Sequence, residues 1–348
     1  MRGDSVRLCI TGGGTGGHLM IAQALAEAAK KKGHATVFIG STSGQDRKYF
    51  QNSLLFDEVH FLETTGVVNQ KGLKKITALI KIFKAFLQAR KILQTRNIDA
   101  TYSVGGFSAA PASFATLSLK KPLFIHEQNA VEGKLNSILK KYATRFISAY
   151  DVHSPIKGYP VKEIFCTTAH KRTDLKTIIF LGGSQGAKAI NELALRVAPM
   201  LQEKGFHIIH QAGERNVDEV QKAYKEMGIE VELYGFTSDL PQLINKADMA
   251  ISRAGASTLW ELTTNGCPAL YIPYPYAAGD HQFYNAKFIV ENDMGWCHRE
   301  GEGLEKALLD AIQNPHLEQK SKKLLQHARC DVAYAMIEDV KKELDSLV

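Results

Sequence analysis

Residues 6–17 read VRLCITGGGTGG and decide the fold, because an apolar strand signal there runs directly into a glycine-rich turn. A helical pattern follows over residues 19–32, Gly33 ends it, and residues 35–39 form the next strand signal. Strand, loop, helix and strand in this order are typical of a parallel sheet with helices on both faces. We therefore expect an α/β fold that opens with a Rossmann-like unit.

The same order of elements restarts in the second half of the chain. Residues 177–187 read TIIFLGGSQGA, which is again a strand signal followed by a glycine-rich turn. Gly12 and Gly182 open the two turns, and Gly33 and Gly205 end the two helical patterns, so the halves run in nearly the same register. Two opening units in register predict two Rossmann-like domains in tandem.

Length and composition fit this division. The chain has 348 residues, more than one ordinary domain holds, and residues 150–176 combine turn-forming residues with a lack of periodicity. We expect an N-terminal domain over residues 1–159, a second domain over residues 160–329, and a terminal helix with one apolar stripe over residues 330–348. No run of about 18 apolar residues occurs, so we expect no membrane span.

The charge balance is basic, at +7 with an isoelectric point near 9.0. Such a balance admits nucleic acid, anionic lipid or phosphorylated substrates as partners and does not choose among them. The basic residues are dispersed, without a basic platform rich in aromatic residues, so we do not expect a nucleic acid partner.

The first glycine-rich turn formally matches G-x-G-x-x-G, and its N–H groups would lie at the positive end of a helix dipole, which suits a phosphate. An NAD enzyme would place a carboxylate at the end of the second strand to hold the ribose. That strand ends near Ser41, and the first acid after it is Asp46, which counts against NAD. No Gly-Lys-Ser/Thr follows the turn, so a P-loop is excluded.

The second glycine-rich turn matches two kinds of site. Its GGSQG fits G-x-S-x-G, from which a hydrolase triad of Ser184, Asp248 and His281 can be drawn. The equivalent turn of the first half holds no serine nucleophile. We therefore favour the simpler interpretation that both turns bind a phosphate or its neighbours.

The sequence predicts no metal site and no cofactor. His126 begins an HExxH-like pattern, but Ala130 stands where the second histidine is needed, and His281 lacks a second ligand at helical or turn spacing. No carboxylate pair with DxD spacing adjoins either glycine-rich turn. We expect structural or hydrogen-bonding roles for both histidines.

A third small-residue turn follows the strand signal over residues 249–252. Residues 253–261 read RAGASTLWE, which places Glu261 in the first turns of a helix. A carboxylate there can accept two hydrogen bonds from a ribose diol, or it can simply complement the helix dipole. The residues alone leave both interpretations open.

Six short motifs stand in a defined order along the chain: GGTGGH at residues 13–18, GGF at 105–107, HEQN at 126–129, GGSQGA at 182–187, ASTLWE at 256–261 and DHQ at 280–282. Together they resemble the MurG family of bacterial N-acetylglucosaminyltransferases, and the match extends over most of the chain. The resemblance implies a GT-B fold, in which two Rossmann-like domains face a central cleft and the terminal helix returns onto the first domain.

The resemblance also implies a reaction. An inverting transferase of this family moves N-acetylglucosamine from UDP-N-acetylglucosamine to the C4 hydroxyl of the N-acetylmuramoyl-pentapeptide unit on undecaprenyl diphosphate. This step converts lipid I to lipid II in peptidoglycan synthesis and serves cell-wall growth, cell shape and cell division. The second domain would hold the donor, and the first would face the acceptor and the membrane. The protein would lie at the cytoplasmic face of the plasma membrane as a peripheral protein.

The same resemblance carries site residues over, position by position. Lys162 stands where the family often has arginine and lacks the bidentate fork, and Phe107 stands where tyrosine is usual and lacks the hydroxyl, so we assign a role to neither. The positions carried over are Glu261 for the donor ribose; Ser184, Gln185, Ala256, Ser257, Thr258 and Leu259 for the uridine and diphosphate; Gln282 and Asn129 for the transferred sugar; and Thr15, Gly16 and Gly17 for the cleft.

For the catalytic base we expect His18, at the mouth of the first turn, because an imidazole with a pKa near its reference value of about 6.5 accepts protons at neutral pH. An open alternative is that His18 only hydrogen-bonds or contacts the acceptor diphosphate. We expect oriented N–H groups and a helix N-terminus to stabilise the departing UDP without a metal ion.

A basic amphipathic pattern over residues 73–93 predicts contact with an anionic membrane surface. An open alternative is an ordinary surface helix whose apolar stripe packs on the sheet. The apolar residues at three- and four-residue spacing are Ile76, Leu79, Ile80, Phe83, Phe86 and Leu87, among lysines 74, 75, 81, 84 and 91.

A UDP-N-acetylglucosamine 2-epimerase is the alternative enzyme on the same architecture, because it would keep nucleotide binding and need no lipid acceptor. A non-catalytic nucleotide-sugar binding protein is a further alternative. His18 and the basic helix favour the transferase.

Overall fold

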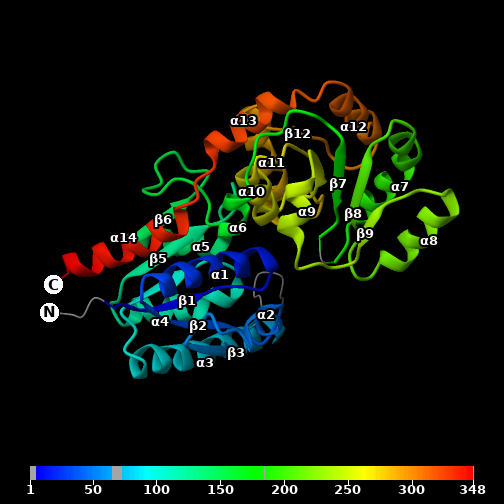
Figure 1. Ribbon diagram of the computed structural model, residues 1–348. Helices are drawn as coiled ribbons and strands as arrows, with labels where there is room; N and C mark the ends of the chain where they lie inside the picture. The colour runs from blue at the N-terminus through cyan, green and yellow to red at the C-terminus, as the bar shows by residue number, and fades with distance from the viewer. Residues whose placement is uncertain (1–4, 65–72, 184, 348) are drawn as a thin grey trace. The chain divides into compact units, whose positions relative to one another are not determined.

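The computed structural model describes residues 5–64, 73–183 and 185–347, without the side chains of residues 73–76. The chain divides into two compact units, which we call unit 1 (Met1–Lys162 with Arg329–Val348) and unit 2 (Glu163–Ala328). Each unit is built around its own six-stranded parallel sheet (Figure 1), so the prediction of an α/β protein with two parallel sheets is confirmed.

The sheet of unit 1 has the strand order β3-β2-β1-β4-β5-β6. The chain first moves outward from β1 in one direction and then returns to the other side of β1 to add β4. The carboxyl ends of β1 and β4 therefore flank the point where the order reverses, which is where ligands bind in open α/β sheets. The strands are β1 (Arg7–Thr11), β2 (Ala35–Ser41), β3 (Glu58–Leu62), β4 (Ala100–Ser103), β5 (Leu123–Glu127) and β6 (Arg145–Ser148).

Three helices of unit 1 cover one face of this sheet. Cys9, Thr101 and Leu123 are register partners across β1, β4 and β5 and therefore point to the same face. Cys9 packs with residues of α3 and α4, and Leu123 packs with residues of α5. The helices of unit 1 are α1 (Gly16–Lys31), α2 (Asp46–Phe50), α3 (Leu73–Thr95), η1 (Phe107–Ala109), α4 (Ala110–Ser118), α5 (Lys134–Leu139), η2 (Lys140–Tyr142) and α14 (Val332–Ser346).

The terminal helix α14 packs against α1 within unit 1. Lys32 donates to Glu338 at 2.6 Å, and Arg145 donates to Glu343 at 2.7 Å, so α14 is tied to the helix and to the edge strand beside it. The predicted apolar stripe faces inward, because Val332, Met336, Val340 and Leu344 are all buried.

Unit 2 repeats the topology with the strand order β12-β11-β10-β7-β8-β9, and β7 and β10 flank its reversal point. The strands are β7 (Thr177–Leu181), β8 (His207–Gln211), β9 (Glu232–Tyr234), β10 (Met249–Ser252), β11 (Ala269–Tyr271) and β12 (Trp296–Cys297). The helices are α6 (Glu163–Thr167), α7 (Lys188–Glu203), α8 (Val217–Met227), α9 (Leu240–Lys246), α10 (Ala256–Asn265), η3 (Ala278–Asp280), α11 (His281–Glu291), α12 (Leu304–Gln313) and α13 (Leu317–His327).

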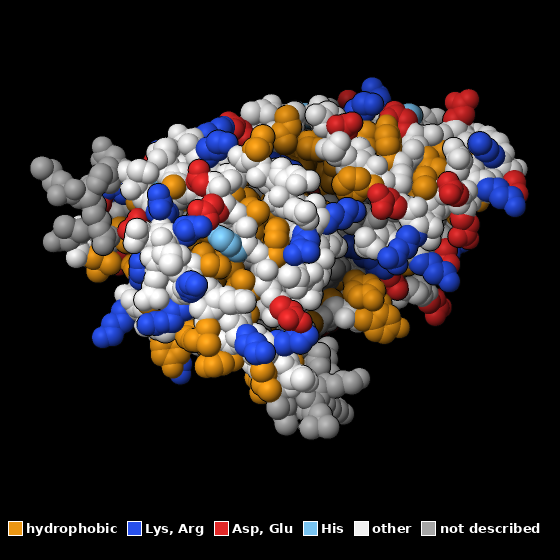
Figure 2. All heavy atoms as spheres, turned by 90° about the horizontal axis from the view of Figure 1, so that it is seen from below, with side chains coloured by type: hydrophobic (Ala, Val, Ile, Leu, Met, Phe, Trp, Pro, Cys, Tyr) orange, Lys and Arg blue, Asp and Glu red, His pale blue; other side chains and the backbone are white. Residues whose placement is uncertain are grey.

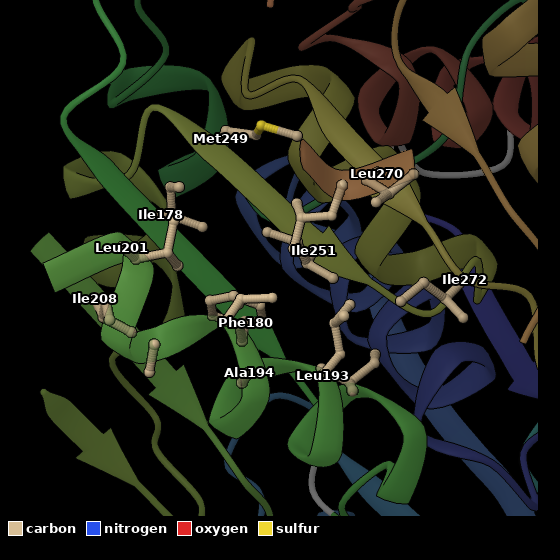
Figure 3. Packing of buried hydrophobic residues seen from close by; sticks show 14 of the residues in the cluster. Ile178, Phe180, Leu193, Ala194, Leu201, Ile208, Met249, Ile251, Leu270 and Ile272 are labelled. Atoms are coloured by element: carbon tan, nitrogen blue, oxygen red, sulfur yellow. The ribbon is translucent and has the colours of Figure 1, made fainter. Parts of the chain in front are cut away.

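The core of unit 2 lies between its central strands and α7 (Figure 3). Ile178 and Phe180 are two residues apart on β7 and, with Ile251 of β10, pack against the apolar face of α7. They share one face of the sheet because successive side chains of a strand point to opposite faces.

A buried arginine joins two helix ends in the same unit. Arg172 is 1% exposed, and its guanidinium donates to the carbonyl oxygens of Ile244 at 3.1 Å and Ala247 at 3.2 Å, and to that of Asn265. These carbonyls lie at the ends of α9 and α10, where the last turn of a helix leaves acceptors without intrahelical donors. The positive charge also complements the helix dipoles there.

Candidate functional site

The glycine turn of unit 1 is held by close backbone packing between the ends of β1 and β4. Gly12 and Gly106 have φ values of +126° and +81°, and a Cβ atom on Gly106 would lie 2.2 Å from the carbonyl oxygen of Gly13. The N–H of Gly13 donates to the carbonyl of Gly105 at 3.2 Å. Glycine is required at this crossing because any side chain would separate the two turns.

A buried carboxylate occupies part of this turn. Asp46 Oδ1 accepts the N–H of Gly14 at 2.6 Å, and its Oδ2 accepts the N–H of Ser41 at 2.8 Å. The amides of Gly13 and Gly14 thus donate to groups within the protein. Thr15, Gly16 and the residues after them form the N-terminal end of α1, where the helix dipole is positive.

His18 is held from both sides in the first turns of α1. Its Nδ1 lies 2.8 Å from Thr15 Oγ1, and its Nε2 lies 2.9 Å from Gln128 Nε2. Because an amide nitrogen only donates, Gln128 donates to Nε2, and Nδ1 carries the ring proton and donates to Thr15. The lone pair that a catalytic base needs is therefore on Nε2, where it accepts the hydrogen bond from Gln128. The sequence analysis missed Gln128, although it lies within the HEQN motif.

A second buried carboxylate shapes the segment after β5. Glu127 accepts the N–H groups of Asn129 and Gly133, both at 2.9 Å, and Nδ2 of Asn136 at 2.8 Å. These bonds hold the backbone of Asn129 and Gly133 close to Glu127 at the end of β5. Glu127 is thus an organising residue that the sequence analysis did not identify.

His126 precedes this carboxylate and is fully buried beside the ring of Tyr159, at 5.3 Å between ring centroids. Burial lowers the pKa of His126 to about 3, with a smaller contribution from His18, so its ring stays neutral. No group of three metal-ligating side chains gathers in the part of the chain that the structure describes.

Phe107 has a packing role next to the first glycine turn. A Cβ atom on Gly14 would lie 2.6 Å from Phe107 Cε1, so the ring lies directly against the turn. A phenylalanine ring supplies this contact without the hydroxyl of a tyrosine.

Unit 2 carries a pocket of about 450 Å³ at the carboxyl ends of β7, β10 and β11. Among the described residues of its lining, Gln282 was predicted as a site residue, and its Oε1 accepts the N–H of Tyr274 at 2.9 Å. Lys188, which directly follows the GGSQGA motif, and Arg253, the first residue of the quoted stretch RAGASTLWE, were not predicted as site residues from the sequence. The lining residues are Gly182, Gly186, Ala187, Lys188, Ala189, Glu192, Arg253, Tyr274, Gln282 and Glu300.

The glycine turn of unit 2 is as closely packed as that of unit 1. Gly186 has a φ value of +80°, and a Cβ atom there would lie 2.3 Å from Asn216 Oδ1. The turn leads into α7, whose N-terminal end borders the pocket at Lys188. Gln185 is exposed on this turn, and Ser184 lies outside the described residues.

The predicted ribose ligand lies on α10 with the other residues of its motif. Glu261 is 7% exposed, and its Oε1 accepts the Ser257 hydroxyl at 3.0 Å, one turn earlier in the helix. Ser257 and Thr258 are half-buried, whereas Ala256 and Leu259 are buried. Residues 256–261 therefore form the positive end of a helix with one carboxylate beside it.

The structure excludes the hydrolase triad. Asp248 accepts the N–H groups of Lys176 at 2.9 Å and Thr177 at 2.8 Å, so it lies at the amino end of β7, whereas the glycine turn follows the carboxyl end of that strand. His281 begins α11, and its Nδ1 lies 2.9 Å from the carbonyl oxygen of Ala278.

Comparisons with known proteins agree with this arrangement. The glycosyltransferase family 28 N-terminal domain matches residues 8–148, and its C-terminal domain matches residues 177–336. A relative in Sulfurimonas denitrificans is 61% identical over 98% of this chain and 100% of its own length. Its name is UDP-N-acetylglucosamine--N-acetylmuramyl-(pentapeptide) pyrophosphoryl-undecaprenol N-acetylglucosamine transferase. The chain belongs to the MurG family of glycosyltransferases.

Solved structures agree with membership of the MurG family. Acinetobacter baumannii MurG is 27% identical, with a TM-score of 0.79 over 97% of this chain and 99% of that one. The GT-B fold that the sequence predicted is thereby confirmed as a fold class. A Listeria monocytogenes UDP-N-acetylglucosamine 2-epimerase structure, described as putative, has a TM-score of 0.64 at 13% identity, over 99% of this chain and 97% of that one. At that identity the likeness to the epimerase concerns the fold alone.

Proposed function

We propose that this protein is a hexosyltransferase that moves N-acetylglucosamine from UDP-N-acetylglucosamine to the lipid-linked N-acetylmuramoyl-pentapeptide, in peptidoglycan synthesis. The observation that carries the proposal is the lining of the unit 2 pocket. It combines groups that suit a diphosphate with a group that suits the hydroxyls of a sugar. The glycine turn and Lys188 at the start of α7 suit a diphosphate, and Gln282 suits a sugar. Whole-length identity to a named transferase supports the same reaction.

We assign the donor nucleotide to unit 2 and the acceptor to unit 1. The N-terminal end of α10, with Glu261 beside it, suits a ribose diol next to a diphosphate, because a carboxylate accepts from hydroxyls and helix amides donate to phosphate. Charge develops on the diphosphate as the anomeric bond breaks, and fixed amides stabilise that charge without reorganising.

We assign the role of base to His18. Its Nε2 carries the lone pair that would accept a proton from the acceptor hydroxyl in place of the Gln128 hydrogen bond, while Thr15 fixes the other ring nitrogen. Proton transfer to Nε2 would leave an imidazolium whose Nδ1–H still donates to Thr15. Thr15 and Gln128 therefore hold the ring in one tautomer, as the second partner of a catalytic histidine commonly does.

We propose that one face of unit 1 binds an anionic membrane surface. Leu79, Ile80, Phe83 and Leu87 on α3 are 49–61% exposed, whereas Phe86 is half-buried. Ile76 is outside the described side chains. Figure 2 shows hydrophobic and basic side chains interspersed on the side where α3 lies. Nearby helices on the same sheet face add exposed Phe114, Ile138 and Tyr142.

The basic residues of that face supply attraction to lipid. Each lysine near an anionic leaflet contributes about 1 kcal/mol. No described helix has both the length and the hydropathy to cross a bilayer. We propose peripheral attachment at the cytoplasmic face of the plasma membrane, with no nucleic acid partner.

An assay with and without acceptor tests the proposed function. Purified protein is incubated with UDP-N-acetylglucosamine, with or without a lipid I analogue, and released UDP is measured. We expect UDP release only with acceptor present, together with a disaccharide-lipid product. Acceptor-independent formation of UDP-N-acetylmannosamine would instead indicate a 2-epimerase, and the absence of turnover with both substrates would contradict the proposal.

A further inference from the structure

An ion pair between Arg253 and Glu300 lines the unit 2 pocket. Arg253, just after β10, pairs with Glu300, which follows β12, and their side chains are 18% and 29% exposed. In the sheet, β11 lies between β10 and β12, so the pair bridges the end of β11. Both side chains are largely withdrawn from solvent, where an ion pair costs desolvation unless its geometry is well supported.

Arg253 is supported on its other sides by backbone. Its Nη1 donates to the carbonyl oxygens of Ile272 at 3.1 Å and Pro273 at 3.4 Å, and its guanidinium lies 5.5 Å from the centre of the Tyr274 ring. These contacts fix the guanidinium to the segment that follows β11. Arg253 is therefore a positioning residue, and Glu300 takes its orientation from it.

Glu300 retains hydrogen-bonding capacity inside the pocket. Its Oε1 is buried and pairs with Nη2 of Arg253. A carboxylate has two oxygens and about four acceptor sites, so this one contact leaves acceptor capacity for a ligand. The side chain also lines the pocket, so a bound ligand can reach the carboxylate.

Gln282 complements this carboxylate in the same lining. Its Oε1 is occupied by the N–H of Tyr274, which leaves the Nε2 amide as its donor to a ligand. One carboxylate acceptor and one amide donor suit hydroxyl groups, which both donate and accept. A diphosphate would not be held by Glu300, because two negative charges repel. Lys188 and the glycine turn supply the diphosphate end instead.

We propose that Glu300, oriented by Arg253, determines donor specificity by accepting hydrogen bonds from hydroxyl groups of the transferred sugar. The inference rests on the proposed function, because it assumes that the pocket holds a sugar carried on a nucleoside diphosphate.

Binding of UDP and of UDP-N-acetylglucosamine, measured by calorimetry on the full chain, tests this inference. Glu300→Gln keeps the size of the side chain and removes its charge. We expect the Kd for UDP-N-acetylglucosamine to rise about 10-fold, as the loss of one charged hydrogen bond implies, while the Kd for UDP changes less than about 2-fold. Glu300→Ala removes the acceptor altogether and is expected to raise the first Kd further.

Two comparisons separate the outcomes. Glu305 on α12, half-exposed and paired with Arg196 at 3.5 Å, provides a control, and Glu305→Gln is expected to change neither Kd. Equal weakening of both ligands by Glu300→Gln, or no weakening of either, would overturn the inference, since only a sugar contact changes their ratio. Wild-type protein that binds UDP but not UDP-N-acetylglucosamine would overturn the proposed function as well.

Discussion

Two buried carboxylates take up backbone donors beside the glycine turn and the end of β5 in unit 1. Asp46 takes the N–H of Gly14 and thereby removes one amide from the glycine turn, and Glu127 takes three donors and thereby positions Asn129. The number of amides available to a phosphate therefore cannot be predicted from a glycine-rich motif alone. The start of α1, next to His18, is a further positive group at this place.

Replacing His18 with alanine should lower turnover far more than donor binding. Loss of a general base typically reduces kcat by about 10²- to 10⁴-fold, whereas the pocket that we propose for the donor lies in unit 2 and should be unaffected. Steady-state transfer assays and calorimetry with UDP-N-acetylglucosamine measure the two quantities. His60→Ala, at a half-buried position on β3, is the matched control and should leave kcat unchanged. A near-normal kcat in His18→Ala would remove this residue from the mechanism.

Replacing Gly106 with alanine should destabilise unit 1 by about 3 kcal/mol or more, because the new Cβ meets the Gly13 carbonyl and φ is positive. Gly33→Ala is the matched control, since Gly33 also has a positive φ, of +74°, but has nothing within 4 Å of an added Cβ. It should cost about 1 kcal/mol. Urea unfolding measures both, and equal losses would show that the close approach between turns is unimportant.

At the scale of elements, α3 has two different apolar stripes. Ala78, Ala85, Ala89 and Leu93 are buried, so mainly small side chains pack the helix onto the rest of unit 1. The larger Ile80 and Phe83 face outward. Packing on the sheet thus accounts for the alanine stripe but leaves Leu79, Ile80, Phe83 and Leu87 about half exposed.

A double substitution on α3 tests membrane binding. Ile80→Glu with Phe83→Glu should reduce sedimentation with anionic phospholipid vesicles at least about 10-fold while the protein stays folded, because it removes apolar area and adds repulsion. Leu54→Glu with Val152→Glu adds the same charge at two other positions of unit 1, which are 89% and 79% exposed, and should have a much smaller effect. Equal sedimentation of wild type and the α3 variant would contradict the membrane face.

At the scale of the whole molecule, periodicity was sufficient to predict the repeated strand and helix pattern. The strands β7 and β10 begin and end where the sequence places them, because both are short apolar runs bounded by turns. The helix α1 begins at Gly16 rather than at residue 19, because two glycines of the turn adopt helical geometry. Lone polar residues such as Gln128 and Glu300 were missed, since their neighbours come from distant strands and depend on the order of the sheet.

Acid should destabilise both units in the same pH range. Burial lowers the pKa values of His126 in unit 1 and His210 in unit 2 to about 3, whereas the unfolded chain has histidine pKa values near 6.5. The unfolded state therefore binds more protons below about pH 6.5, and each histidine should reduce the free energy of unfolding by up to about 1.4 kcal/mol per pH unit down to about pH 3.

Urea unfolding at pH 7.5, 6 and 5 measures this dependence. His126→Asn and His210→Asn should each flatten the slope of unfolding free energy against pH, even if they lower the free energy at pH 7.5. Slopes that remain equal to that of the wild type in both variants would show that neither buried histidine stays neutral in the folded protein.

We propose that oriented amides in unit 2 hold the diphosphate of the donor. A crystal structure with bound UDP-N-acetylglucosamine tests it most directly. We predict that the pyrophosphate lies against the glycine turn after β7 and the first turn of α10, with the sugar toward Gln282. A well-ordered donor whose pyrophosphate contacts neither of these helix and turn ends would contradict the account.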